Sequence, residues 1–210
     1  MQHKLKLLIV VLLFPLILSC VKPGMAYLRY GDLARNSKSW DEAIVQYDKS
    51  IAADPTYAPA YHNRGLSYYH KLEYGKAIED FSKSIELDPN RSDSYYQRGK
   101  SYFAVKNYPE SIADFTRVTE LDPNKAADAY YERGNTYYTM GDYNKAIVDF
   151  SQTISLDPNY PEIYYYRGNA YANLGEYELA LADYRKALSK DSEPVLRKAL
   201  CPFLYHGSGK

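Results

Sequence analysis

The sequence predicts an all-α solenoid built from helix-turn-helix repeats, and three observations lead to this fold class. The dipeptide Asp-Pro recurs four times, with its prolines 34, 34 and 35 residues apart. The dipeptide Arg-Gly also recurs four times, at spacings of 34, 35 and 34 residues. Both series gain their extra residue in the turn near Asn124 to Ala126, where an insertion is tolerated, so they share one register.

Within this register the chain divides into five repeats, each with two helices, A and B. The repeats span residues 24–57, 58–91, 92–126, 127–160 and 161–192. The Asp-Pro pair ends helix B, because the residue before a proline avoids the helical region and an Asp side chain bonds the nearby backbone. A single helical hairpin cannot bury its apolar face alone, so the copies must stack on one another.

Four positions carry the residue types expected where helices A and B cross. Counted from the first residue of each repeat, position 8 is Gly, position 20 is Ala or Ser, and positions 17 and 24 are aromatic: Gly31, Gly65, Gly99, Gly134 and Gly168; Ala43, Ala77, Ser111, Ala146 and Ala180; Trp40, Tyr74, Tyr108, Tyr143 and Tyr177; Tyr47, Phe81, Phe115, Phe150 and Tyr184. Small residues let the two backbones approach, and aromatic rings fill the space around the crossing. We therefore expect each Gly to pack against the small residue of helix B.

This pattern resembles the tetratricopeptide-repeat family over residues from about Gly24 to Pro194. Two departures are visible: Ala34 stands where the other repeats have Tyr, and Ser192 replaces the last Pro. The resemblance implies a right-handed α-solenoid of five helix-turn-helix tetratricopeptide repeats. It also implies a protein without catalytic activity that binds other proteins in a concave groove lined by the A helices.

The N-terminal segment is predicted to be a targeting signal. Two lysines precede an apolar stretch at residues 7–18, which is shorter than the roughly 20 residues of a membrane-spanning helix. The following sequence, Ile17 to Cys20, resembles the lipobox of bacterial lipoproteins. That resemblance implies a cleaved signal at 1–19, a short tether at 20–23, and acylation of Cys20 by chains such as palmitate. The protein would then be exported and lipid-anchored in the bacterial cell envelope. An ordinary signal peptide cut near a chance Cys, or an uncleaved anchor, remains open.

The C-terminal residues are predicted to close the solenoid. Residues 193–202 form a short capping helix in this interpretation, because Pro194 suits a first helical turn and Pro202 stops the helix. The tail at 203–210 is expected to be disordered.

Composition and motifs argue against a catalytic, metal-binding or nucleic-acid-binding role for this chain. Its 26 basic and 26 acidic residues cancel, so nothing favours nucleic acid. No phosphate-binding loop, dinucleotide fingerprint or metal motif is present. His62 and His70 are two helical turns apart, about 12 Å, too far to share one metal, and we expect both on the groove surface. Cys201 is expected to be a free thiol, with an intermolecular disulfide as the alternative. We therefore predict no catalytic residue, metal or cofactor.

A repeated Arg at position 7 and a repeated Asp at position 23 predict ion pairs. Pairing within each repeat leaves no partner unmatched, which predicts four pairs: Arg64–Asp80, Arg98–Asp114, Arg133–Asp149 and Arg167–Asp183. Pairing between repeats would leave Asp183 unpaired. The alternative is an arginine ladder that binds an anionic ligand.

The family resemblance also supplies a candidate ligand-binding groove, lined by positions 2, 5, 6, 9, 12 and 13 of the A helices. On this chain it singles out nine residues: Tyr69, Tyr96, Lys100, Phe103, Tyr131, Asn135, Tyr138, Tyr165 and Asn169. Tyr131 and Tyr165 stand where a carboxylate clamp needs cations, which argues against such a clamp. Aromatic rings flanked by amides suit an extended or Pro-containing peptide, or a short helix. Alternatively, the Tyr rings mainly pack against neighbouring helices.

The sequence thus predicts a lipid-anchored scaffold that binds an unidentified protein or peptide partner, with self-association possible. Two alternatives remain open. Aromatic rings also stack on sugars, which would suit a carbohydrate- or peptidoglycan-binding accessory protein. The chain could instead be a regulatory subunit of an enzyme encoded elsewhere.

Overall fold

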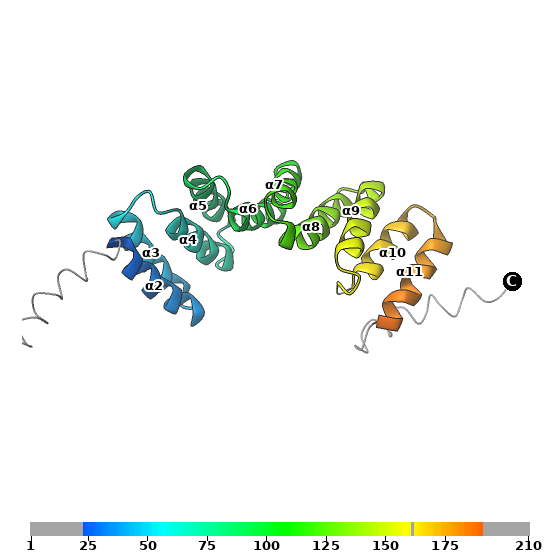
Figure 1. Cartoon of the computed structure of the whole chain (residues 1–210), viewed down its shortest axis with the longest axis horizontal. Helices are drawn as coiled ribbons and strands as arrows, with labels where there is room; N and C mark the ends of the chain where they lie inside the picture. Colours follow the sequence, from blue (N-terminus) through cyan, green and yellow to red (C-terminus); the bar gives the residue numbers. More distant parts are fainter. Residues whose placement is uncertain (1–22, 161, 191–210) are drawn as a thin grey trace, which may run out of the picture. The chain divides into compact units, whose positions relative to one another are not determined.

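The computed structural model describes residues 23–160 and 162–190. Within these residues it contains ten α-helices, one 3-10 helix and no strand. The chain divides into two compact units, Met1–Ser101 and Tyr102–Lys210 (Figure 1). The predicted signal, the acylated Cys20, the capping helix and Cys201 lie outside the described residues.

The first unit contains two complete helical hairpins and most of the next A helix. Its elements are α2 (Pro23–Asn36), α3 (Trp40–Ala53), α4 (Ala58–His70), α5 (Tyr74–Leu87) and the larger part of α6 (Ser92–Ala104). Helix α2 packs on α3, and α4 packs on both α3 and α5. The order is therefore that of A and B helices stacked in succession.

The second unit repeats this arrangement. Its elements are the end of α6, α7 (Tyr108–Leu121), η1 (Pro123–Lys125), α8 (Ala126–Thr139), α9 (Tyr143–Leu156), α10 (Ile163–Asn173) and α11 (Tyr177–Lys190). Helix α8 packs on α7 and α9, and α10 packs on α9 and α11. Helix η1 occupies the turn that holds the extra residue of the third repeat. Together the two units confirm the predicted all-α fold of helix-turn-helix repeats.

The turns after the B helices explain the Asp of each Asp-Pro pair. The side chain of Asp88 accepts a hydrogen bond from the backbone N–H of Asn90, two residues on, and Asp157 does the same for Asn159. Such turns satisfy backbone donors that the helix end leaves open. The side chains of Asp54 and Asp122 make equivalent bonds.

The close approach of helices A and B depends on the Gly at position 8, although its contact differs from the one expected. A Cβ atom added at Gly134 would lie 2.8 Å from Cε1 of Phe150, and one at Gly65 would lie 2.9 Å from Cε1 of Phe81. The glycines therefore pack against the aromatic ring at position 24 rather than chiefly against the small residue at position 20. The ring needs this space because it is fully buried at the crossing.

Candidate functional site

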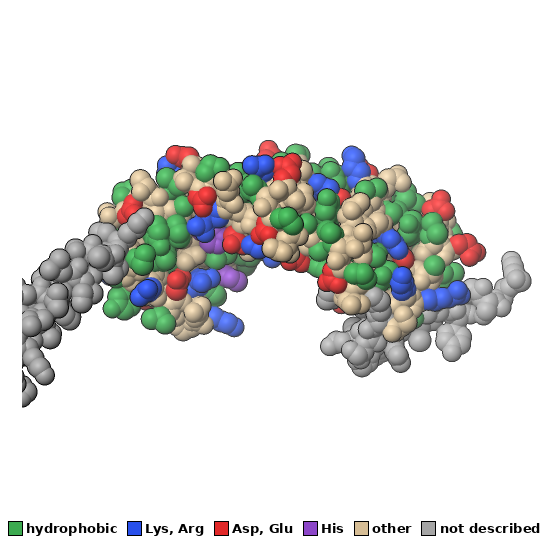
Figure 2. Space-filling view, in the orientation of Figure 1, with side chains coloured by type: hydrophobic (Ala, Val, Ile, Leu, Met, Phe, Trp, Pro, Cys, Tyr) green, Lys and Arg blue, Asp and Glu red, His purple; other side chains and the backbone are tan. Residues whose placement is uncertain are grey.

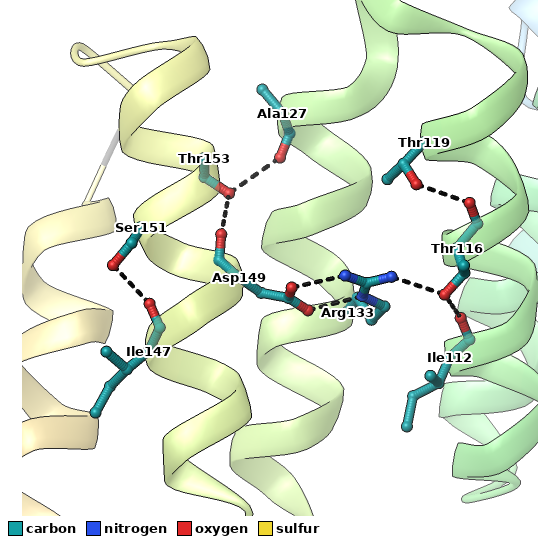
Figure 3. Close-up of polar contacts among 9 residues, drawn as sticks. All are labelled: Ile112, Thr116, Thr119, Ala127, Arg133, Ile147, Asp149, Ser151 and Thr153. Carbon is teal, nitrogen blue, oxygen red and sulfur yellow. Dashed lines mark hydrogen bonds and ion pairs between the residues drawn. The ribbon is translucent and has the colours of Figure 1, made fainter.

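The arginine at position 7 joins three helices in the second unit. Nε and Nη2 of Arg133 donate to Oδ2 and Oδ1 of Asp149 at 2.8 and 2.7 Å, which is the predicted pairing within one repeat (Figure 3). Its Nη1 donates to Oγ1 of Thr116, on the preceding B helix, at 2.8 Å. The Arg133 side chain is 17% exposed and that of Asp149 3%, so the pair is largely desolvated, and the carboxylate raises the pKa of Arg133.

The other arginines of the row make equivalent contacts. Arg64 bonds Asp80 through two nitrogens at 2.8 and 2.6 Å, and Arg167 bonds Asp183 at 2.7 and 2.8 Å. The pairing of Arg98 with Asp114 would join the two units and stays a prediction. These bidentate internal contacts give the arginine row a structural role, so an anion-binding ladder is not supported.

Sequence reasoning missed the third contact of each arginine. Nη1 always reaches position 25 of the preceding repeat, where an oxygen-bearing side chain stands: Asp48, Ser82, Thr116 and Ser151. The recurrence of a hydroxyl or carboxylate at this position was a readable signal. Each arginine therefore links its own repeat to the preceding one. Arg64, Arg133 and Arg167 also link the two helices of their own repeat.

We call the side chains at positions 2, 5, 6, 9, 12 and 13 of the A helices the helix-A face of each unit. On the first unit this face carries a connected set of rings. His70 stacks on Trp40 with ring centroids 4.4 Å apart, and Tyr69 meets His70 edge-on at 5.9 Å. The ammonium of Lys100 lies 5.7 Å from the ring centroid of Tyr69 and 5.8 Å from that of Tyr96.

His62 stands at position 5 but is buried, so the expectation that it lies on the groove surface was wrong. Its Nδ1 lies 2.9 Å from Oγ of Ser94, and its ring faces Phe81. Because Ser94 is also bonded to Ser84, the imidazole completes a small polar network inside the hairpin stack. His70 is exposed, as expected.

Tyr131 anchors the helix-A face of the second unit and also packs within it. Its ring centroid lies 5.0 Å from that of Tyr160, 5.4 Å from Tyr166 and 6.3 Å from Phe150. A hydrogen bond with Tyr131 raises the pKa of the Tyr166 hydroxyl. The alternative that the tyrosines pack against neighbouring helices therefore holds for Tyr131, which is half-buried.

The remaining predicted residues of this unit differ in how many contacts they make. Tyr184 donates its hydroxyl to Oδ1 of Asn169 at 2.8 Å, and its ring lies 6.1 Å from Tyr165. The amide of Asn173 donates to the hydroxyl of Tyr138 at 3.0 Å. Asn173 was not among the predicted residues, although it occupies position 13 of the same face. Phe103, near the start of the unit, is 36% exposed and lies against Tyr108.

Among these side chains, Asn135 makes the fewest polar contacts with the described residues. It is half-buried at position 9 of α8, between Tyr131 and Tyr138 in sequence. Within the described part of the chain, its amide makes no hydrogen bond to another residue. At the same position Asn169 and Asp32 each accept a bond from a Tyr of helix B, whereas helix B offers Asn135 only Phe150. Its amide is therefore available to a ligand.

Over residues 23–160 and 162–190, His, Cys, Asp and Glu side chains form no group that could hold a metal ion. Among the described helices, none combines the length and the apolar composition needed to cross a bilayer.

Comparison with known families identifies the repeat. The family model described as TPR repeat matches residues 31–71, 99–141 and 134–175, and the model described as Tetratricopeptide repeat matches 58–91 and 161–194. No curated protein sequence matches the chain.

Several solved structures share the fold. The crystal structure of MamA protein is 31% identical, with a TM-score of 0.76 over 80% of this chain and 92% of that one. YrrB, described as a TPR protein with an unusual peptide-binding site, is 23% identical, with a TM-score of 0.73 over 87% and 94%. PilF of Pseudomonas aeruginosa is 18% identical, with a TM-score of 0.70 over 81% and 78%.

Proposed function

Because this chain belongs to the tetratricopeptide-repeat family, we propose that it is a non-enzymatic scaffold that binds a segment of a partner protein on its helix-A faces. The observation that carries the proposal is the side-chain amide of Asn135, which makes no hydrogen bond to another described residue and stands among half-buried aromatic residues of α8. An amide offers both a donor and an acceptor, which matches the backbone of an extended peptide. The peptide-binding site attributed to YrrB supports the same use of the fold.

The second unit offers the ring surface for side chains of the bound segment. Tyr138 and Tyr165 lie on successive A helices, and Tyr138 is linked to Asn173 of the second of them. The rings are held by their own contacts, so little conformational entropy is lost when a ligand packs on them. We propose that Tyr69, Tyr96 and Lys100 belong to the binding surface of the first unit, and that Phe103 and Asn169 belong to that of the second.

We also propose that the protein is exported and anchored by acyl chains on Cys20, in keeping with the lipobox-like sequence that ends at this residue. The site of action would then be a bacterial envelope, and the partner a component of an envelope assembly. Several acyl chains would hold the protein stably, since each buried methylene contributes about 0.8 kcal/mol.

An affinity pull-down from detergent-solubilised envelopes tests the binding function. The full chain should recover a partner, and Asn135→Ala should recover about threefold to tenfold less, the range expected when one net hydrogen bond of about 1 kcal/mol is lost. Gln152→Ala is the matched control, because Gln152 is an exposed amide on helix B of the same unit. Recovery of no protein by the wild type, together with pelleting on purified cell wall, would contradict the proposal and favour the carbohydrate-binding alternative.

A further inference from the structure

The two units differ in the charge of their helix-A faces. On the second unit the face carries Asp128, Glu132 and Glu162 and no Lys or Arg. On the first unit it carries Arg29, Arg35 and Lys100 against Asp32 and Asp93, and Lys38 follows in the turn after α2. Figure 2 shows Lys and Arg side chains close to His side chains over the first unit.

Lys100 is the most informative of these cations. It is half-buried on α6, with its ammonium near the rings of Tyr69 and Tyr96. Within the part of the chain that the structure describes, neither Lys100 nor Lys38 forms an ion pair. The ammonium of Lys100 lies over two aromatic rings, whose faces attract a cation without neutralising its charge. The charge of Lys100 can therefore meet the carboxylate of a ligand.

Arg35 contributes a second incomplete cation to the same region. Its nearest carboxylate oxygen is Oδ1 of Asp32 at 3.6 Å, and that oxygen already accepts bonds from Tyr47 and Asn63. Its Nε is shielded from solvent and donates to none of the described residues. The Arg35 side chain is 30% exposed and its contact with Asp32 is long, so its positive charge is only partly offset and attracts the carboxylate of a ligand.

The pKa of His70 reflects the positive potential that these cations produce. Burial lowers its pKa, and the charges of Arg35, Lys100 and Lys38 lower it further, so all three cations act at the Trp40–His70 stack. Asp32, the acidic side chain on α2 nearest to these cations, does not reverse this effect. The stacked rings supply an apolar surface close to these cationic residues.

We infer that the partner segment bound on the first unit is acidic, with carboxylates that meet Lys100 and Arg35 and a neighbouring aromatic or aliphatic side chain that rests on the Trp40–His70 stack. This inference rests on the proposed binding function and specifies the chemistry of its ligand. A protein segment with a few carboxylates suits the site better than a nucleic acid, because the cations on this face are few and are interspersed with Asp32 and Asp93, which disfavours a continuous phosphate backbone.

The test uses fluorescence anisotropy with the full chain in detergent micelles. The probe is a fluorescein-labelled octapeptide of alternating Glu and Tyr, and its reference is the same peptide with Gln in place of Glu. The Glu peptide should bind at least tenfold more tightly, and Lys100→Gln should remove most of that difference. Lys83→Gln, which removes an equal charge from α5, should leave binding unchanged. In NMR titrations, the Glu peptide should raise the pKa of His70 and the Gln peptide should not.

Equal binding of the Glu and Gln peptides, absence of binding by both, or no effect of Lys100→Gln would overturn the inference. An oligothymidylate of equal charge that binds as tightly as the Glu peptide would overturn the choice of a protein segment. The two proposals fail separately. A pull-down that depends on Asn135 but is unaffected by Lys100→Gln leaves the binding function standing and rejects only the acidic ligand.

Discussion

At the scale of single residues, each arginine at position 7 makes a contact that its spacing in the sequence does not predict. The recurrence of Arg at position 7 and Asp at position 23 in the same four repeats predicted the Arg133–Asp149 pair, because pairing within a repeat leaves no partner unmatched. This recurrence did not reveal the bond from Arg133 to Thr116, because that contact depends on how one repeat packs on the preceding one. The burial of His62 was missed for a related reason, since its partner Ser94 belongs to the following repeat.

The Arg133–Asp149 pair should show strong energetic coupling. Asp149→Ala leaves a largely buried guanidinium without its carboxylate and should lower the free energy of unfolding by about 3 kcal/mol. The double variant with Arg133→Ala should lose clearly less than the sum of the two single losses, because it leaves no unpaired charge. Urea unfolding followed by circular dichroism measures this cycle. Additive losses would show that the pair does not interact.

A second test at this scale concerns the hydroxyl of Tyr184. The three middle repeats have Phe at this position, so the ring of Tyr184→Phe should fit the same space. The variant loses the bond to Asn169 and should be destabilised by about 1 kcal/mol. The control is Tyr177→Phe, at an exposed tyrosine of the same helix. Equal unfolding midpoints for the two variants would contradict a role for this hydrogen bond.

At the scale of helices, the repeated dipeptides were sufficient to predict the helical hairpins. Asp-Pro marks the ends of α3, α5, α7 and α9, because the Asp side chain bonds the turn and the Pro cannot continue the helix. Which surfaces touch at each crossing was harder to predict. A glycine can accept a neighbour from several directions, and only the crossing angle determines that Phe150 fills the space beside Gly134.

This contact predicts opposite effects of the same substitution at two helical glycines. Gly134→Ala would place a Cβ atom 2.8 Å from the fully buried ring of Phe150, and should destabilise the protein by about 1–3 kcal/mol through overpacking. Gly75→Ala, near the start of α5, meets no atom within 4 Å and should be neutral or stabilising by up to about 1 kcal/mol. Thermal unfolding of both variants decides the matter, and the reverse order would refute the described crossing.

At the scale of the whole molecule, the protein has two units whose helix-A faces differ, and we propose that a membrane anchor precedes them. The candidate residues could be predicted as positions of the repeat. The contacts that each side chain makes could not be predicted. Tyr131 packs within its unit, Asn169 is bonded to Tyr184, and the amide of Asn135 remains available to a ligand. These differences arise from neighbours on other helices, so the sequence pattern of a single repeat does not contain them.

The anchor has its own test. Cells that express the wild-type chain should incorporate radiolabelled palmitate into it, and Cys20→Ser should abolish incorporation and release the protein from the membrane fraction. Cys201→Ser is the matched control and should keep the label. Labelling of the Cys20→Ser variant would show that this residue is not the acylation site.

The most direct test of the central claim, that the helix-A face binds a partner, is site-specific photocrosslinking in intact cells. A photoreactive benzoylphenylalanine replaces Tyr138 on the helix-A face in one variant, and Val148 on α9 in the other. Val148 is 58% exposed, so it provides an accessible control on a B helix. We predict a discrete crosslinked partner from position 138 and none from position 148. The same partner captured only from position 148 would place binding on the B helices and contradict the account.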